Sequence, residues 1–345
     1  MSSWKADFSH IYAEPTVMDS SLAESLKRKF PGAAWIPVQD YREIFNRPRQ
    51  RFQHQKGSMK LILAQKKDSL LYRGSDNAQD FGVSHFFYVT PVLNCLYNCD
   101  YCFLQGMYQS ANLVVFANQE AMIAEMRETA LRLQDFGEEM MTAISYNTDL
   151  LAMEPWLGLC QHWIEANRSL PNSNIEIRTK SGNFRSLRSL EPAQNAVLAW
   201  TVSPPEVFRS YESRTAPPAV RIRAAAEAAQ RGWPVRICLD PVLKIPHWQK
   251  IYTTFIDDLF ATLPPDHIRD LSLGVFRMSS TYFKTIRAPR PTSDLYYYPF
   301  QARNGLTKYP DSDQEEMMEA LTAHLSRYLE PEKMEAWSGG DKSSG

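Results

Sequence analysis

The chain has 345 residues, of which 44% are hydrophobic and 22% charged, and its formal net charge is −1. This composition is typical of a soluble globular protein with one large or two ordinary domains. A near-zero net charge gives no sign of an overall nucleic-acid-binding protein, so any such surface has to be a local patch. The first residues lack an apolar signal core and no run approaches membrane-spanning length, so we expect no membrane contact.

Residues 1–84 are predicted to form an N-terminal extension that packs on the rest of the chain. Within it, Ser21 and Glu24 form a capping-box pattern at the start of a helix, which the pair Pro31-Gly32 ends. The stretch 40–84 is charged and irregular, and its basic residues include Arg47, Arg49, Arg51 and Lys56. We interpret this basic run as a solvated surface in preference to a phosphate-binding strip.

From residue 85 onward, segments with strand character alternate with segments of helical periodicity. Such alternation is typical of a parallel sheet wrapped by helices, so we predict an α/β fold. Six units are fewer than the eight of a closed barrel, and the prediction is therefore a partial (β/α)6 barrel of the TIM type. The expected strands are 86–90, 142–146, 174–179, 196–202, 235–239 and 270–276, and the expected helices are one from Asn118, then 155–166, 184–190, 220–231 and 248–263.

The predicted barrel spans 85–280, followed by a C-terminal hairpin and helix extension, 281–337, and a disordered tail, 338–345. In barrels of this kind the chemistry lies at the carboxyl ends of the strands. Each polar residue at those ends could alone be a turn or cap residue, but their gathering at one rim indicates a site. These residues are Asn94, Thr148, Asp149, Lys180, Ser203, Asp240 and Arg277.

Three cysteines, Cys95, Cys99 and Cys102, stand within eight residues. Thiolates select zinc, copper(I) or iron–sulfur clusters, and three of them can hold three corners of a four-iron cluster while the fourth iron stays free for a ligand. A structural zinc site is one alternative, with His85 as the only nearby histidine. A disulfide scaffold is disfavoured by the odd total of five cysteines. Three buried cysteines without chemistry are the last alternative.

Further motifs occur in order along the chain beyond the cysteines. They are Cys99–Gln105, Val115–Asn118, Arg178–Lys180, Tyr211–Thr215, Arg221–Ala226, Gly232–Pro234, Asp240-Pro241 and Trp248. Together, from about Ile11 to Tyr328, they resemble the spore photoproduct lyases, a family of radical S-adenosylmethionine (SAM) enzymes.

The resemblance implies a [4Fe–4S] cluster held by the three cysteines, with SAM at its open iron. In this family, reductive cleavage of SAM gives a 5′-deoxyadenosyl radical that takes a hydrogen atom from a cross-linked thymine dimer in ultraviolet-damaged DNA, and the dimer then separates into two thymines. The resemblance therefore implies a DNA-repair lyase, with DNA as partner and a reductant such as flavodoxin or ferredoxin. An oxygen-sensitive cluster and few cysteines suit a reducing, cytoplasmic environment.

The resemblance also assigns contacts to SAM. Lys180 would pair with the SAM carboxylate, and Asp149 would accept a hydrogen bond from the SAM amino group. Lys180 and Asp149 could instead form a salt bridge at the rim. The other residues assigned to the cofactor are Thr148, Ser203 and Asp240.

Two departures from the family concern the catalytic residues. Photoproduct lyases carry a cysteine after the serine at the end of the second strand, which returns a hydrogen to the product radical, and Tyr146 stands there in this chain. The family's tyrosine directly after the last cluster cysteine is Phe103 here, which cannot give a hydrogen atom. Cys238, expected on the same strand face as Asp240, could return a hydrogen directly or through Tyr146, or could be a small core residue. Tyr101, just before the last cysteine, completes the candidate catalytic residues.

A third departure concerns the basic hairpin that follows the barrel in this family. It corresponds to 295–303, keeps Arg303 and, beyond it, Lys308, and has Tyr297 and Tyr298 in place of arginines. Tyrosines could stack on bases or fill the gap left by a flipped lesion. They could equally be ordinary strand residues.

The leading hypothesis is a spore-photoproduct-lyase-like radical SAM enzyme that acts on damaged DNA. Because the resemblance specifies the radical generator better than the substrate, a different nucleic acid or a small molecule is an alternative. A nucleic-acid-binding iron–sulfur sensor without turnover is the alternative from another class. Formation of 5′-deoxyadenosine separates the enzymes from the sensor.

Overall fold

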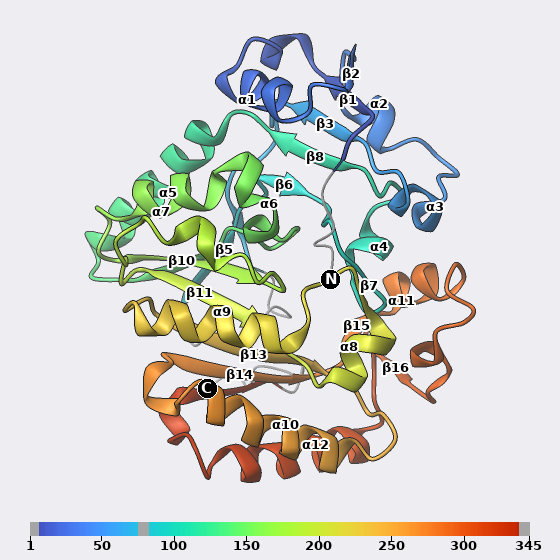
Figure 1. Cartoon of the computed structure of the whole chain (residues 1–345), viewed down its shortest axis with the longest axis vertical. Coiled ribbons are helices and arrows are strands. Elements are labelled where there is room, and N and C mark those ends of the chain that lie inside the picture. The colour runs from blue at the N-terminus through green and yellow to red at the C-terminus, as the bar shows by residue number, and fades with distance from the viewer. Residues whose placement is uncertain (1–6, 75–82, 338–345) are drawn as a thin grey trace.

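The computed structural model describes residues 7–74 and 83–337; the tail expected at 338–345 lies outside these ranges. Its main sheet has eight strands in the order β18-β14-β13-β11-β10-β9-β5-β4 (Figure 1). All neighbours in it run parallel except β4, which is antiparallel to β5. The strands are β4 (Tyr72–Arg73), β5 (His85–Tyr88), β9 (Met140–Ala143), β10 (Ser173–Thr179), β11 (Ala196–Thr201), β13 (Val235–Val242), β14 (Asp270–Val275) and β18 (Met334–Trp337).

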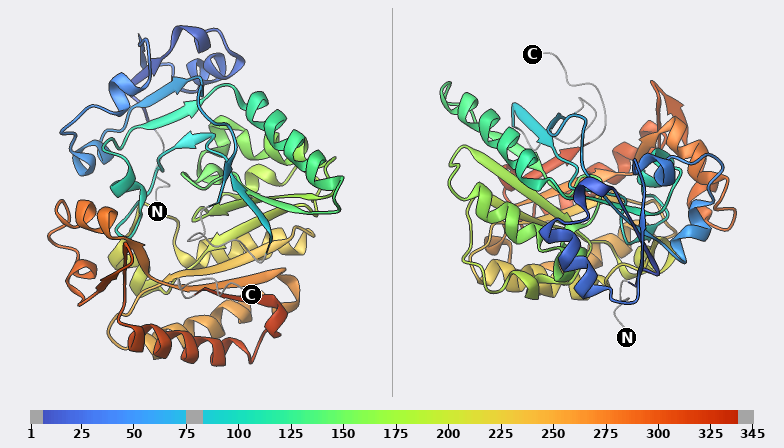
Figure 2. Two further views of the ribbon diagram at one scale, coloured as in Figure 1. Left: turned by 180° about the vertical axis from the view of Figure 1, so that it is seen from behind. Right: turned by 90° about the horizontal axis from the view of Figure 1, so that it is seen from above.

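Helices cover the outer face of this curved, open sheet (Figure 2). Strand β11 is buried along its whole length, as expected for a parallel strand covered on both faces. The crossover from β10 to β11 contains only the 3-10 helix η2 (Phe184–Leu187), whereas the others contain α-helices. Those helices include α5 (Gln119–Gln134), α6 (Leu150–Leu157), α7 (Leu159–Asn167), α8 (Pro205–Tyr211), α9 (Pro218–Gln230) and α10 (Trp248–Thr262), with η3 (Pro265–His267) after α10.

The segment after β9 differs from the sequence prediction. Strand β9 ends at Ala143, so Tyr146 lies in the following loop and not on the strand. The single helix expected at 155–166 is two helices, α6 and α7, because Gly158 between them has a left-handed φ of 67°. Helix α6 begins ahead of Pro155 because the Asp149 side chain caps it and accepts the amide of Ala152 at 3.0 Å.

A second sheet joins the N-terminal extension to the barrel segment. Its order is β2-β1-β3-β8-β6, in which β8 pairs in parallel with β3 and antiparallel with β6. The strands are β1 (His10–Ala13), β2 (Ala34–Pro37), β3 (Leu61–Ala64), β6 (Val92–Leu93) and β8 (Leu113–Phe116), and the extension adds η1 (Pro15–Val17), α1 (Ser21–Lys29), α2 (Arg42–Phe45) and α3 (Phe52–Lys56). One hydrophobic core cluster contains side chains from all of these regions, and the bounds between them stay a prediction.

The cap of α1 lies one residue earlier than expected. Ser20, not Ser21, accepts the amide of Ala23, at 3.2 Å, and Ser21 is the first helical residue.

The C-terminal extension returns to the main sheet through β18. It comprises β15 (Arg277–Ser279), α11 (Ser280–Arg287), η4 (Asp294–Tyr297), β16 (Gln301–Arg303), β17 (Leu306–Lys308), α12 (Asp311–Leu325) and η5 (Pro331–Lys333). The hairpin of β16 and β17 turns at Asn304-Gly305, whose φ angles are 49° and 78°. Two successive positive φ angles are what a two-residue hairpin turn requires. The hairpin therefore begins after Tyr297 and Tyr298, which were expected within it.

The remaining short elements belong to the cysteine loop. They are β7 (Asn98–Cys99), which pairs antiparallel with β12 (Glu212–Ser213), and α4 (Leu104–Met107). Helix α4 packs on α11, and a Cβ added to Gly106 would lie 2.6 Å from the Cα of Tyr282. Only glycine lets the two helices approach this closely.

Over the described ranges, no helix is long and apolar enough to cross a membrane.

Candidate active site

A cavity of about 460 Å³ opens at the carboxyl ends of the parallel strands. The cysteine loop forms one wall, the ends of β9, β10, β11 and β13 form another, and the segment from Phe276 to Tyr282 contributes a third. Of the residues predicted for the site, those that line the cavity are Cys95, Cys99, Tyr101, Cys102, Tyr146, Thr148, Asp149, Lys180, Asp240 and Arg277. Asn94, Ser203 and Cys238 are buried and do not line it.

The three cysteines of the loop come to one wall of this cavity. Asn94 turns the chain just before them with a φ of 69°, and its amide donates to the carbonyl oxygens of Ser110 and Asn112 at 2.7 and 2.8 Å. Within the described ranges, no three His, Cys, Asp or Glu side chains gather closely enough to hold one metal ion. A cluster differs from a single ion in this respect, because each cysteine binds a separate iron.

The zinc alternative finds no support in this arrangement. His85 lies away from the cysteines on β5, and its Nε2 is 2.5 Å from Oε2 of Glu138. Burial raises the pKa of Cys95 to about 12 and also raises that of Cys99. Buried thiols of this kind ionise only when a metal cation replaces their protons. Binding of metal to the cysteine loop should therefore release protons.

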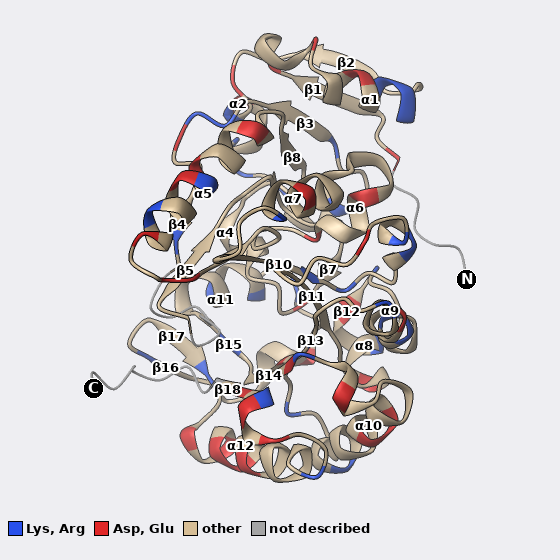
Figure 3. Cartoon of the chain, turned by 90° about the vertical axis from the view of Figure 1, so that its left-hand side faces the viewer, with Lys and Arg blue, Asp and Glu red and all other residues tan. Residues whose placement is uncertain are grey.

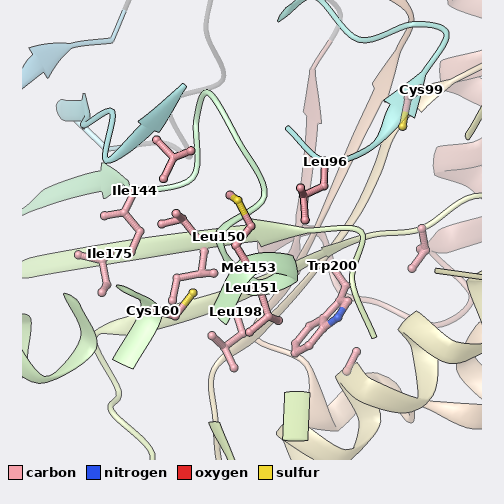
Figure 4. Close-up of a cluster of buried hydrophobic side chains, with 14 of the residues drawn as sticks. Leu96, Cys99, Ile144, Leu150, Leu151, Met153, Cys160, Ile175, Leu198 and Trp200 are labelled. Carbon is pink, nitrogen blue, oxygen red and sulfur yellow. The ribbon is translucent and has the colours of Figure 1, made fainter. Parts of the chain in front are cut away.

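Cys160 is not a fourth ligand of this loop. It lies on α7 and is fully buried, and the hydrophobic cluster around it includes Ile144, Ile175 and Leu198 (Figure 4). Its own amide donates to Glu154 at 2.6 Å. This environment is that of a packing residue.

Side chains from distant parts of the chain hold the cysteine loop in place. The Arg290 guanidinium, which follows α11, donates to Asp100 and, at 2.7 Å, to Oδ1 of Asn98. Arg290 also donates to Oε1 of Gln105 at 2.8 Å, while the amide of Gln105 donates to the carbonyl of Cys99 at 2.6 Å. From α3, the ammonium of Lys56 donates to the carbonyl oxygen of Cys95. No sequence pattern indicated Lys56 or Arg290, because their partners lie 39 and 185–192 positions away.

Tyr101 is anchored by a buried ion pair. Its hydroxyl donates to Glu212, and Glu212 in turn pairs with Arg221, both fully shielded from solvent. Arg221 also donates to Oγ1 of Thr215 at 2.6 Å. Burial acts to raise the pKa of Glu212, but the charges of Arg221 and Lys180 outweigh it and that pKa lies below its usual value. Both members of the pair lie in motifs that carried the family resemblance, although no role had been assigned to them.

The residues assigned to SAM occupy two kinds of environment. Asp149 is buried and accepts Thr179 Oγ1 and the Lys180 amide, both at 2.7 Å, in addition to its cap of α6. Burial raises its pKa in spite of these bonds. In the described part of the chain, the buried hydroxyls of Thr148 and Ser203 have no hydrogen-bond partner.

The salt bridge between Lys180 and Asp149, which was the alternative to SAM binding, is not formed. Only the backbone amide of Lys180 bonds to Asp149. The Lys180 ammonium lies 5.2 Å from the centre of the Tyr101 ring, and no carboxylate of the described residues is within 4.0 Å of it. A cation above a ring face at the cavity wall remains available to an anionic ligand.

Asp240 is held between two arginines. Its carboxylate oxygens lie 3.9 Å from Arg178 and 3.5 Å from Arg277. Cys238, one layer below on β13, is fully buried, and burial raises its pKa to about 12. Strand β13 therefore carries an ion-paired carboxylate at the cavity and a buried thiol that does not reach it.

Tyr146 presents its ring to the cavity beside Phe103. The two ring centres are 6.0 Å apart, and Tyr146 stacks on Tyr88 at 4.4 Å. Burial raises the pKa of the Tyr146 hydroxyl, so that it keeps its proton at neutral pH.

The C-terminal residues proposed for nucleic acid do not line the cavity and have protein partners. Lys308 and Arg303 lie 2.8 and 3.6 Å from the carboxylate of Asp311 at the start of α12, a helix rich in acidic residues (Figure 3). Tyr298 is half-buried and donates to Asp313, whereas Tyr297 is 63% exposed. Of the two tyrosines, Tyr297 is the more exposed, and the Arg287 guanidinium lies over its ring at 5.8 Å from the ring centre.

The Glu212–Arg221 pair gives a stability prediction. We expect Glu212→Gln to lower the free energy of unfolding by about 3–5 kcal/mol at neutral pH, because it leaves Arg221 buried without its counter-charge. The lowered pKa of Glu212 makes this difference fully present above its unfolded value of about 4.3 and lost as pH falls through the folded value. Urea unfolding of both proteins from pH 7 to pH 3 measures it. A constant difference at all pH values would contradict the ion pair.

The chain is similar in sequence and in fold to known proteins. The family model described as spore photoproduct lyase matches residues 7–338. The spore photoproduct lyase of Bacillus subtilis (strain 168) is 20% identical over 343 residues, which cover 94% of this chain and 96% of that protein.

Two solved structures share the fold. Spore photoproduct lyase complexed with dinucleoside spore photoproduct superposes with a TM-score of 0.80 at 16% identity, covering 96% of this chain and 98% of that one. A double mutant of spore photoproduct lyase with bound AdoMet and dinucleoside spore photoproduct gives a TM-score of 0.79 at 15% identity, with the same coverage of both chains. With the family match spanning nearly the whole length, the chain belongs to the spore photoproduct lyase family.

Proposed function

We propose that this protein is a radical SAM lyase that repairs thymine photoproducts in ultraviolet-damaged DNA. The observation that carries the proposal is that Cys95, Cys99 and Cys102 line the same cavity as the polar ends of the parallel strands. We further propose that strands β5, β9, β10, β11, β13 and β14 constitute the partial (β/α)6 barrel of this enzyme class.

The residues present fit an iron–sulfur cluster and SAM. Three thiols at one wall supply the ligands of a cluster with one open iron. The unpartnered hydroxyls of Thr148 and Ser203 are buried polar groups of the kind that a bound ligand satisfies. When bound, the cluster and SAM supply a 5′-deoxyadenosyl radical, and the protein supplies placement and exclusion of water.

Two charged residues would orient the cofactor. Lys180 offers an ammonium to the SAM carboxylate from the end of β10. Asp149 accepts one hydrogen bond at Oδ2 and two at Oδ1, so Oδ2 has capacity for the SAM amino group. In this assignment Asp149 has two tasks, capping α6 and binding the cofactor.

Tyr146 is the better candidate for returning a hydrogen to the substrate. Its ring lines the cavity, whereas Cys238 does not. The step moves one hydrogen atom from the Tyr146 hydroxyl to the carbon radical of the substrate and leaves a tyrosyl radical, which one electron from a protein reductant and one solvent proton restore. Flavodoxin or ferredoxin is the class of reductant that would serve both this step and SAM cleavage.

DNA is the proposed partner because the related solved structures contain dinucleoside spore photoproduct. The exposed ring of Tyr297 offers a stacking surface. Since Arg303 and Lys308 are paired with Asp311, their part in DNA binding would require exchange of Asp311 for a phosphate.

The assignment of Lys180 predicts a selective loss of cofactor affinity. Lys180→Ala should weaken SAM binding by about 1.5–3 kcal/mol, the range for a charge-assisted hydrogen bond, with iron content unchanged. Anaerobic equilibrium dialysis measures it, with Lys244→Ala as control, because Lys244 pairs with Asp313 and Glu316 outside the cavity. Equal affinity in Lys180→Ala and the native protein would remove Lys180 from the SAM site.

The cysteine assignment predicts which thiols SAM cleavage needs. After anaerobic reconstitution with iron, sulfide and dithionite, Cys102→Ala should form no 5′-deoxyadenosine, whereas Cys160→Ala should form it as the native protein does. The same reactions with dinucleoside spore photoproduct should yield thymidine only where 5′-deoxyadenosine forms. Cleavage of SAM without repair would favour another substrate, and a stable cluster without any cleavage would favour the sensor.

The hydrogen donor can be identified by solvent deuterium. The Tyr146 hydroxyl exchanges with solvent, so native protein in D₂O should place deuterium in the repaired thymine. Tyr146→Phe should lose this label and accumulate side products of the substrate radical, while Cys238→Ala should keep it. Loss of the deuterium label in Cys238→Ala alone would instead assign hydrogen return to the Cys238 thiol.

A further inference from the structure

Lys56 is a buried ammonium without an acidic partner. It is the last residue of α3 and is 3% exposed. Within the described ranges, no carboxylate oxygen lies within 4.0 Å of its Nζ. Its contacts are neutral: the carbonyl oxygen of Cys95, the sulfur of Met59 at 3.7 Å, and the ring of Phe52 with its centre at 5.3 Å.

An ammonium in this position is costly unless an anion is close. Removing a charge from water is repaid only when an opposite charge and good hydrogen bonds replace the solvent. Burial lowers the pKa of Lys56; among its charged neighbours, ionised Cys95, Cys102 and Cys99 act to raise that pKa and the guanidinium of Arg214 acts to lower it. Three of these four groups are the proposed cluster ligands, and the fourth is another cation.

A second buried lysine, Lys66, does not have cysteines as its electrostatic neighbours. Lys66 is 8% exposed and also lies over aromatic rings, those of Tyr72 and Phe116, with centres at 5.2 and 5.3 Å. Its ammonium has the Tyr72 hydroxyl at 2.8 Å and the carboxylate of Asp68 among its electrostatic neighbours. No thiol is among the main groups that act on it.

We propose that Lys56 is the counter-ion of the iron–sulfur cluster and sets how readily the cluster accepts an electron. Three cysteine thiolates make the loaded loop anionic, and one-electron reduction adds a further negative charge. A fixed cation at the loop stabilises the reduced state most, since that state carries the larger charge. Lys56 is thus a positioning residue that acts through the cluster and does not touch SAM or substrate.

The proposal rests on the cluster of the proposed function, and its test separates charge from hydrogen bonding. Lys56→Gln keeps a donor for the Cys95 carbonyl and removes the charge, Lys56→Arg keeps the charge, and Lys66→Gln is the control. The measurement is the midpoint potential of the reconstituted cluster, from a redox titration followed by electron paramagnetic resonance. We expect a shift to more negative potential in Lys56→Gln alone, with native values for the other two variants.

A second measurement uses protein without iron, in case Lys56→Gln does not retain a cluster. With the thiols protonated, the ammonium has no counter-charge, so Lys56→Gln should be as stable to urea as native apoprotein or more stable. In reconstituted protein, iron loss to a chelator should instead be faster in the variant. A native potential in Lys56→Gln, or a destabilised apoprotein, would overturn the proposal and leave Lys56 as a hydrogen-bond donor. Failure of the native chain to form any cluster would instead refute the proposed function.

Discussion

The cysteine loop depends on buried charged side chains supplied by segments that are far away in sequence. Its regular structure is limited to the two residues of β7 and the four of α4, so backbone hydrogen bonds within the loop cannot fix the three thiols. Lys56 from α3, Glu212 in β12 and Arg290 after α11 hold it instead. The site therefore exists only when the N-terminal extension, the barrel and the C-terminal extension are folded against one another.

The same contacts distribute charge unevenly around the cavity. The acidic groups there are already engaged: Glu212 with Arg221, Asp240 with two arginines, and Asp149 with three donors. Among the described residues, no carboxylate lies within 4.0 Å of the ammonium groups of Lys56 and Lys180. A cavity whose anions are paired and whose lysines lack a direct ion pair is suited to a negatively charged cluster and to a ligand carboxylate. This balance is a property of the fold, since most of the partners come from different strands and loops.

The sequence predicted the features that are local. Alternating periodicity located six strands of the main sheet within a few residues but missed its outermost strands, β4 and β18, and cysteine spacing located the loop. It failed where neighbouring residues compete: Pro155 suggested a helix start, but the cap at Asp149 begins the helix earlier and Gly158 divides it. The sequence did not reveal that Lys56 and Arg290 contact the cysteine loop. A lysine in a basic stretch is expected to be solvated, and Lys56 is buried only because its partner Cys95, 39 positions later, lies against it. The sequence also placed Tyr297 and Tyr298 on a hairpin that begins only at Gln301.

Two residues at the cavity, Tyr146 and Phe103, differ from the pattern of the photoproduct lyases. In photoproduct lyases, by the resemblance, a cysteine follows the second strand and a tyrosine follows the last cluster cysteine; here Tyr146 and Phe103 occupy those places. Their rings are neighbours, 6.0 Å apart, so the two changes affect one patch of the cavity wall. The family pattern has one thiol and one phenolic hydroxyl in that patch. This chain has no thiol there and one phenolic hydroxyl, which is on Tyr146 instead of at the position of Phe103. Of these two residues, only Tyr146 can donate a hydrogen atom, and its ring is held by stacking on Tyr88. This arrangement favours an enzyme that still returns a hydrogen atom to the substrate radical.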